Sequence, residues 1–307
     1  MQSEANNIIE IHALTFAYRK QAVLNGIDLE VPQGSIFGFL GPNGAGKSTT
    51  IKIMLDLLQV PAGKVFLFGK ELHSNKIEIQ KQTGAMVESP SLYEHLNAFK
   101  NLEITQRLRQ IPAGRIAEVL DIVGLSKYAH RKVRQYSTGM KQRLSLAIAM
   151  LGSPRLLILD EPINGLDPSG IIEIRNLLSQ LNREHGCTIF LSSHILDEIE
   201  KICSDVAVIN GGKVLYQGKM DGLLQRYSKQ ERVLIETDNN EAAALILKPG
   251  SFQIKDQFLS ISLESRQETP ALIKQLVEKG ISIYSVEPDR SDLESSFLEI
   301  LQEGGQS

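Results

Sequence analysis

The sequence predicts a mixed α/β chain in two domains: a large α/β domain with a mainly parallel sheet and a helical insertion, then a small α+β domain. Three observations predict this class. Short apolar runs alternate with helical patterns from residue 8 to about 218, strand patterns stop between residues 94 and 152, and the order of elements changes near residue 228. We therefore expect one domain over residues 1–228, with a helical subdomain at about 94–152, and another over residues 231–307.

Apolar runs predict the strands of the large domain. They read SIFGFL, KVFLFG, GAMVE, RLLILD, CTIFLSS and VAVIN. Because runs that are apolar on both faces are typical of strands covered by helices on both sides, we expect these strands to form one largely parallel sheet. Three segments with 3.6-residue spacing predict the helices of the insertion: HLNAFKNLEITQRLRQI, AGRIAEVLDIVGL and STGMKQRLSLAIAMLG.

The last part of the chain has a different order of elements. We expect a strand in RVLIETD, a helix in NEAAALILK, two strands in SFQIKDQFLSISLE, a helix in ETPALIKQLVEKG, a strand in ISIYSVEP and a final helix in SDLESSFLEILQ. The order β-α-β-β-α-β predicts a ferredoxin-like domain. Its acidic residues are dispersed, with no phosphate-loop or metal-ligand spacing, so we expect no catalysis there.

Composition narrows the classes of function. At 307 residues and 42% hydrophobic content the chain can build a substantial core, and Lys+Arg 33 against Asp+Glu 36 leaves no global basic field for a nucleic-acid partner. Cys187 and Cys203 lie in apolar surroundings without CxxC spacing, which favours core residues in a reducing cytosol. The N-terminus lacks a basic region followed by an apolar core, and no run of about 18 apolar residues occurs, so we expect neither export by a signal peptide nor a membrane span.

The stretch GPNGAGKST, residues 41–49, matches the pattern G-x-x-x-x-G-K-S between a predicted strand and a predicted helix. In that context backbone N–H groups and a helix N-terminus surround phosphate oxygens, Lys47 reaches the β and γ phosphates, and the Ser48 hydroxyl binds Mg²⁺. The alternative interpretation is an ordinary glycine-rich turn that carries a surface lysine. The expected nucleotide-binding residues are Asn43, Gly44, Ala45, Gly46, Lys47, Ser48 and Thr49.

In the segment RLLILDEP an apolar run is followed by a pair of acids, Asp160 and Glu161. Two carboxylates at the carboxyl end of a parallel strand face the ligand crevice of such a sheet. Asp160 suits the Mg²⁺ sphere, and Glu161 suits a general base or polariser for an attacking water. Taken alone, the pair also fits an exposed turn, and the phosphate loop upstream is what favours a site.

A third carboxylate, Glu88, stands where the apolar run in GAMVESPSLYEHL breaks at a serine and a proline. Its position fits either a solvated loop residue or a ligand. The position of Glu88 alone does not decide between these two interpretations.

The segment YSTGMKQRLSLA decides among the classes of ATPase. Residues 136–140 resemble the signature motif, usually LSGGQ, of ATP-binding-cassette (ABC) proteins: Ser137 and Gly139 match it, whereas Thr138 and Met140 depart from it. Other cassette motifs follow in the family's order over residues 8–220. They are Tyr18, similar to the aromatic residue that stacks on adenine; Asp167, in a D-loop-like NGLDP; and His194, similar to the switch histidine. Two other interpretations stay open: Tyr18 as an ordinary aromatic residue of a strand, and His194 as a histidine with a purely structural role.

The resemblance implies an ATPase that uses ATP and Mg²⁺ and pairs head to tail, as a homodimer or with a very similar subunit. It also implies that this pair drives a separate transmembrane permease from the cytoplasmic side of the bacterial membrane. Glu88 stands where the family usually has the glutamine of the Q-loop, and exporters of the bacitracin-resistance and lantibiotic-immunity type likewise have glutamate there. This position implies that Glu88 belongs to the Mg²⁺ sphere, where its added negative charge makes the site depend steeply on magnesium. The C-terminal ending also resembles exporter cassettes. One rival is a soluble regulatory or mechanical ATPase without a permease. A nucleotide kinase or GTPase is disfavoured, because the signature, the D-loop and His194 would have no purpose there.

Overall fold

A computed structural model describes residues 7–87, 92–227, 231–247, 252–255, 257–263 and 266–288. The chain divides into two compact units, Met1–Met220 and Asp221–Ser307. This division lies somewhat before the position expected from the sequence, because helix α8 (Met220–Tyr227) falls at the junction. Two expectations lie outside the described residues: the position of Glu88 and the final helix over residues 291–302.

The large unit is built on a six-stranded sheet in the order β10-β9-β3-β8-β7-β6. All neighbouring pairs are parallel except β10 and β9, so the predicted largely parallel sheet is confirmed. Its central strands are buried along their whole length, as their apolar composition requires. The strands are β3 (Ile36–Leu40), β6 (Thr83–Met86), β7 (Leu156–Leu159), β8 (Thr188–Ser193), β9 (Asp205–Asn210) and β10 (Lys213–Lys219).

The prediction was wrong for one strand, the run KVFLFG. Its strand β4 (Val65–Leu67) belongs to a second sheet, where it pairs antiparallel with β1 rather than joining the parallel strands. Buried Val65 and Leu67 flank half-buried Phe66, an alternation that is typical of a sheet with one wetter face. That sheet has the order β2-β1-β4-β5, with β1 (Asn7–Tyr18), β2 (Gln21–Pro32) and β5 (Lys70–Glu71).

The main core of the large unit joins the two sheets to helix α1 (Lys47–Met54). Phe37 of β3 stacks on Phe190 of β8 with ring centroids 5.8 Å apart, and both side chains are fully buried. Full burial of such a side chain contributes about 1.5–3 kcal/mol. This packing fixes the strands that precede the phosphate loop and His194.

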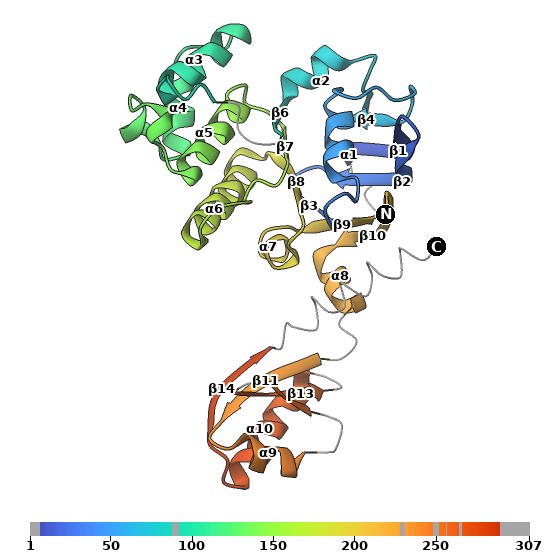
Figure 1. The fold of residues 1–307 in the computed structure, drawn as a ribbon, viewed down its shortest axis with the longest axis vertical. Coiled ribbons are helices and arrows are strands. Elements are labelled where there is room, and N and C mark those ends of the chain that lie inside the picture. Colours follow the sequence, from blue (N-terminus) through green and yellow to red (C-terminus); the bar gives the residue numbers. More distant parts are fainter. Residues whose placement is uncertain are drawn as a thin grey trace. The chain divides into compact units, whose positions relative to one another are not determined.

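Helices occupy the chain between β6 and β7. Figure 1 shows α3, α4 and α5 gathered to one side of the central strands, in green, which confirms the helical insertion. Their bounds are α3 (Ala98–Leu108), α4 (Arg115–Ile122) and α5 (Thr138–Met150), with short 3-10 turns at Ser126–Tyr128 and Val133–Gln135. The other helices of the unit are α2 (Lys76–Gln82), α6 (Pro168–His185) and α7 (Leu196–Glu200).

The small unit has the predicted element order β-α-β-β-α-β in its described part. Its sheet has the order β12-β13-β11-β14, and every neighbouring pair is antiparallel. Each helix therefore connects two strands that have a third strand between them, as in a split βαβ arrangement. The elements are β11 (Glu231–Thr237), α9 (Asn240–Ile246), β12 (Phe252–Lys255), β13 (Phe258–Leu263), a 3-10 turn at Arg266–Glu268, α10 (Thr269–Glu278) and β14 (Ile283–Pro288).

Candidate active site

The phosphate loop connects β3 to α1, and two of its glycines leave no room for a side chain. A Cβ on Gly41 would stand 2.2 Å from the Ile209 carbonyl oxygen, and a Cβ on Gly46 would stand 2.6 Å from Leu24 Cδ2. Gly46 also has φ +114, a conformation that glycine alone adopts readily. The loop can therefore pass close under the neighbouring strands and place the N-terminus of α1 at its end.

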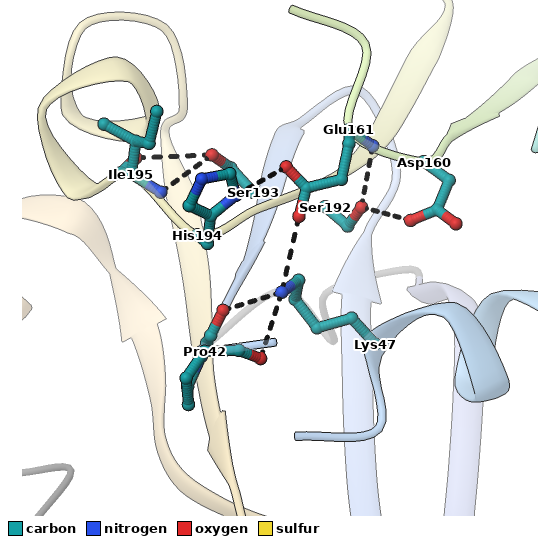
Figure 2. Close-up of polar contacts among 9 residues, drawn as sticks. Pro42, Lys47, Asp160, Glu161, Ser192, Ser193, His194 and Ile195 are labelled. Atoms are coloured by element: carbon teal, nitrogen blue, oxygen red, sulfur yellow. Dashed lines mark hydrogen bonds and ion pairs between the residues drawn. The ribbon is translucent and has the colours of Figure 1, made fainter. Parts of the chain in front are cut away.

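Lys47 opens α1 and folds back over the loop. Its Nζ donates to the carbonyl oxygens of Gly41 at 2.7 Å and Pro42 at 3.2 Å, and lies 3.4 Å from Glu161 Oε1 (Figure 2). The residue is only 5% exposed. A buried ammonium must be paired, and here three oxygens accept from it or neutralise it. Of the other loop residues, Asn43, Gly44 and Ser48 are exposed, whereas Ala45 and Thr49 are buried.

The carboxyl end of β7 places Asp160 beside β8. Asp160 is 7% exposed, and its Oδ1 accepts a hydrogen bond from Ser192 Oγ at 2.6 Å. The same Ser192 oxygen accepts from the backbone N–H of Glu161 at 2.9 Å (Figure 2). Ser192 thus fixes both acids, and sequence reasoning missed it. A signal was present, because Ser192 and Ser193 are polar residues at the end of an otherwise apolar strand.

Glu161 lies between Lys47 of the loop and His194. Its Oε2 accepts from Nδ1 of His194 at 2.9 Å while its Oε1 faces Lys47 (Figure 2). Because an ionised carboxylate only accepts hydrogen bonds, Nδ1 carries the proton in this arrangement. The structure therefore brings Lys47, Asp160, Glu161 and His194 together at the carboxyl ends of β3, β7 and β8, the edge at which open α/β sheets bind ligands.

Glu198 of α7 is a titratable neighbour of this group that the sequence did not single out. Burial raises the pKa of its carboxyl above the ordinary value, while the nearby imidazole of His194 acts in the opposite direction. The negative charge of Glu161 also raises that pKa. Glu198 therefore keeps its proton to higher pH than a free glutamate does.

Other predicted site residues have local partners of their own. Ser137 caps α5, its Oγ accepting from the Met140 N–H at 3.2 Å, and Gly139 lies in the first turn of that helix. Asp167 caps α6 by accepting from the Gly170 N–H at 3.1 Å. Figure 1 shows α5 and α1 on opposite sides of the central strands, so the structure does not bring the signature residues to the phosphate loop of the same chain.

Tyr18 ends β1 and is 45% exposed. Its ring packs edge to face against Phe16 at 5.0 Å between centroids. One face of an exposed ring is what base stacking requires, and the same position also fits an ordinary strand aromatic.

The donor set at this edge fits Mg²⁺. Within the described ranges no three His, Cys, Asp or Glu residues gather into a metal-binding cluster. Mg²⁺ does not need one, because it is usually held by one or two protein oxygens together with phosphates and water. The oxygens of buried Asp160 and exposed Ser48 are donors of the right kind.

Comparison with known proteins agrees with this geometry. The ABC transporter family model matches residues 24–164. The bacitracin transport ATP-binding protein BcrA of Bacillus licheniformis is 39% identical over 306 residues, covering 97% of this chain and 99% of that protein. The ABC transporter ATP-binding protein YhcH of Bacillus subtilis is 37% identical and covers 96% of each chain. The lantibiotic transport ATP-binding protein SrtF of Streptococcus pyogenes is 38% identical over 70% of this chain and 92% of that protein.

Solved structures show the same fold. CbiO1 of Clostridium perfringens, part of the ABC transporter complex cbiONQ, matches with a TM-score of 0.65 at 25% identity, over 73% of this chain and 95% of that one. None of the helices within the described ranges is long and apolar enough to cross a membrane. Three findings therefore agree: the strand–loop–helix around Lys47, the two acids that follow β7, and relatives that are similar along almost the whole chain. This chain belongs to the ATP-binding proteins of ABC transporters and is an ATPase subunit with the cassette fold.

Proposed function

We propose that the chain drives a separate permease that exports an antimicrobial peptide or peptide antibiotic of the bacitracin or lantibiotic kind. The observation that carries this proposal is the extent of the similarity to BcrA, which spans 97% of this chain and therefore both compact units. The similarity to SrtF covers 70%. Glu88 in the Q-loop position and the resemblance of the C-terminal ending to exporter cassettes support the same choice.

The working form in this proposal is a head-to-tail homodimer at the cytoplasmic face of the membrane, attached peripherally through the permease. The position of α5 supports it, because this helix, which begins next to Ser137, lies on the other side of the central strands from α1, the helix that follows the phosphate loop. A second copy turned head to tail would bring its signature residues to that loop. Two ATP molecules would then be enclosed between the protomers.

Each site residue has a role in this proposal. Residues 43–49 hold the triphosphate, with Lys47 on its terminal phosphates, and Tyr18 stacks on adenine. Glu161 takes a proton from the attacking water, and His194 orients Glu161 and contacts the γ-phosphate. Asp167 lies at the start of α6, from which it would face the partner's nucleotide.

Magnesium would be held by Ser48 and Asp160 together with Glu88, and would supply positive charge to the phosphate oxygens. A charge on Glu88 about 4 Å from another carboxylate would cost about 4 kcal/mol at an effective dielectric near 20, unless the cation lies between them. The charge of Glu88 therefore sets how steeply the ATPase depends on magnesium.

Glu88→Gln is expected to keep the ligand geometry, to soften the magnesium dependence and to leave ATP hydrolysis measurable. Glu88→Ala should impair permease-coupled turnover more than nucleotide binding. The measurement is a magnesium titration of the ATPase rate and of transport for the wild type and both variants. Three superimposable curves would show that this carboxylate is a solvated loop residue.

Export is tested in a susceptible bacterial host that expresses the chain with the polytopic membrane protein that co-purifies with it. We expect a several-fold rise in the inhibitory concentration of bacitracin or of a lantibiotic, and loss of that rise with Glu161→Gln. Recovery of the chain without any membrane protein would favour the rival, a soluble regulatory or mechanical ATPase. Co-purification with a permease but no change in resistance would reject the proposed substrate class.

A further inference from the structure

The buried side-chain amide of Gln142 in α5 holds the backbone next to Glu161. Gln142 lies in α5, is 8% exposed, and donates from Nε2 to the carbonyl oxygen of Pro162 at 2.6 Å. The two residues are 20 positions apart in the sequence. Inside a protein such a bond is stronger than in water, and breaking it leaves two buried polar groups without partners.

The Glu161 backbone needs contacts of this kind. It has φ +49, a left-handed conformation that residues with a side chain rarely adopt and that persists only where the surroundings impose it. On its N-terminal side the Glu161 N–H donates to Ser192 Oγ at 2.9 Å. On its C-terminal side the Glu161 carbonyl accepts from the Asn164 N–H at 3.1 Å, and Pro162, which has no N–H, offers only its own carbonyl, in the next peptide, for a further contact. Gln142 binds that carbonyl.

Gln142 also lies close to the signature residues along the helix. Gln142 stands five positions after Ser137, about 7.5 Å of helical rise. A contact at the start of α5 therefore acts on Gln142 through less than two turns of one helix.

We infer that Gln142 is a positioning residue for Glu161, which couples the signature residues to the general base of the same protomer. When the partner's nucleotide binds Ser137 and Gly139, α5 is fixed, and Gln142 then fixes the Pro162 carbonyl and with it the direction of the Glu161 carboxylate. This inference rests on the proposed roles of Glu161 and of the signature. It adds that the nucleotide held in the phosphate loop of one protomer orients Glu161 of the other protomer.

Gln142→Leu, which keeps the size of the side chain and removes the donor, is expected to lower kcat for ATP hydrolysis by the full chain about 10- to 100-fold. KM for ATP and the ATP dissociation constant should stay within about twofold of wild type. The matched control is Gln180→Leu, which removes a surface amide that donates to Glu184 at 2.8 Å and should change neither constant. A kcat equal to wild type in a folded Gln142→Leu protein would overturn the inference.

Gln142→Glu separates positioning from packing. The introduced carboxyl can donate to Pro162 only while it is protonated, and burial raises its pKa. The ratio of variant kcat to wild-type kcat should therefore rise as the pH falls from about 8 to about 5.5. A ratio that does not change with pH would contradict a role for the donor, and this reading holds even if the leucine variant does not fold.

A double substitution tests the route of the effect. If Gln142 acts through Glu161, then Gln142→Leu should not further reduce the residual hydrolysis of Glu161→Gln. An equal loss in both backgrounds would refute action through the base. Wild-type rates in Glu161→Gln alone would instead reject Glu161 as the base, and thus the proposed mechanism rather than Gln142.

Discussion

Glu161→Gln is expected to lower the rate of ATP hydrolysis at saturating Mg-ATP about 10²- to 10⁴-fold, or about 3–5 kcal/mol in activation free energy. The amide has the size of the carboxylate but cannot take a proton from water. It can still accept from His194, whose Nδ1 lies 2.9 Å from the carboxylate in the wild type. Binding therefore survives while turnover is lost.

Under those conditions both nucleotides remain between the protomers, and the variant should be a dimer by light scattering. The same change at Glu184, an exposed residue in the last turn of α6, is the control and should leave rate and assembly unchanged. A monomeric Glu161→Gln protein at saturating Mg-ATP would count against the proposed head-to-tail pair.

Lys47→Ala is expected to weaken ATP binding about 10²- to 10³-fold. Two unit charges 4 Å apart interact by about 4 kcal/mol at an effective dielectric near 20, and part of this is offset by the cost of burying the ammonium. The change also leaves the Glu161 carboxylate without the cation 3.4 Å away. Calorimetric titration with ATP, with melting temperature as a check of folding, measures the effect. Lys52→Ala, at the far end of α1, is the control.

Ser137→Asp should prevent dimer formation and leave ATP binding intact, the reverse of what is expected for Lys47→Ala. Aspartate is a good N-cap, so the Met140 N–H keeps an acceptor and α5 keeps its start. Its charge would repel the partner's triphosphate. We expect ATP affinity near wild type and no nucleotide-dependent dimer. Equal losses of ATP affinity in Ser137→Asp and Lys47→Ala would mean that the two motifs do not divide binding and pairing between them.

Local patterns predicted the fold class of this chain. The apolar runs correspond to β3, β6, β7, β8 and β9, and the segments with 3.6-residue spacing correspond to helices α3, α4 and α5. In the described part of the small unit the order of elements is as expected. These features depend on propensity and periodicity within a few residues, which a sequence shows directly. The same holds for Lys47, Asp160 and Glu161, because each stands directly after a recognisable strand or glycine-rich loop.

Pairing between distant segments was decided by the tertiary structure. The sequence could not assign β4 to the antiparallel sheet, because a short apolar run fits either kind of strand. Ser192 contacts Asp160 across 32 residues of sequence, and Gln142 contacts Pro162 across 20. Neither contact produces a periodic pattern in the sequence. The left-handed backbone of Glu161 is likewise imposed by its surroundings. The sequence by itself located Lys47, Asp160, Glu161 and His194 as candidate groups of the site, whereas the orientation of the acids depends on hydrogen bonds that exist only once β7, β8 and α5 are packed together.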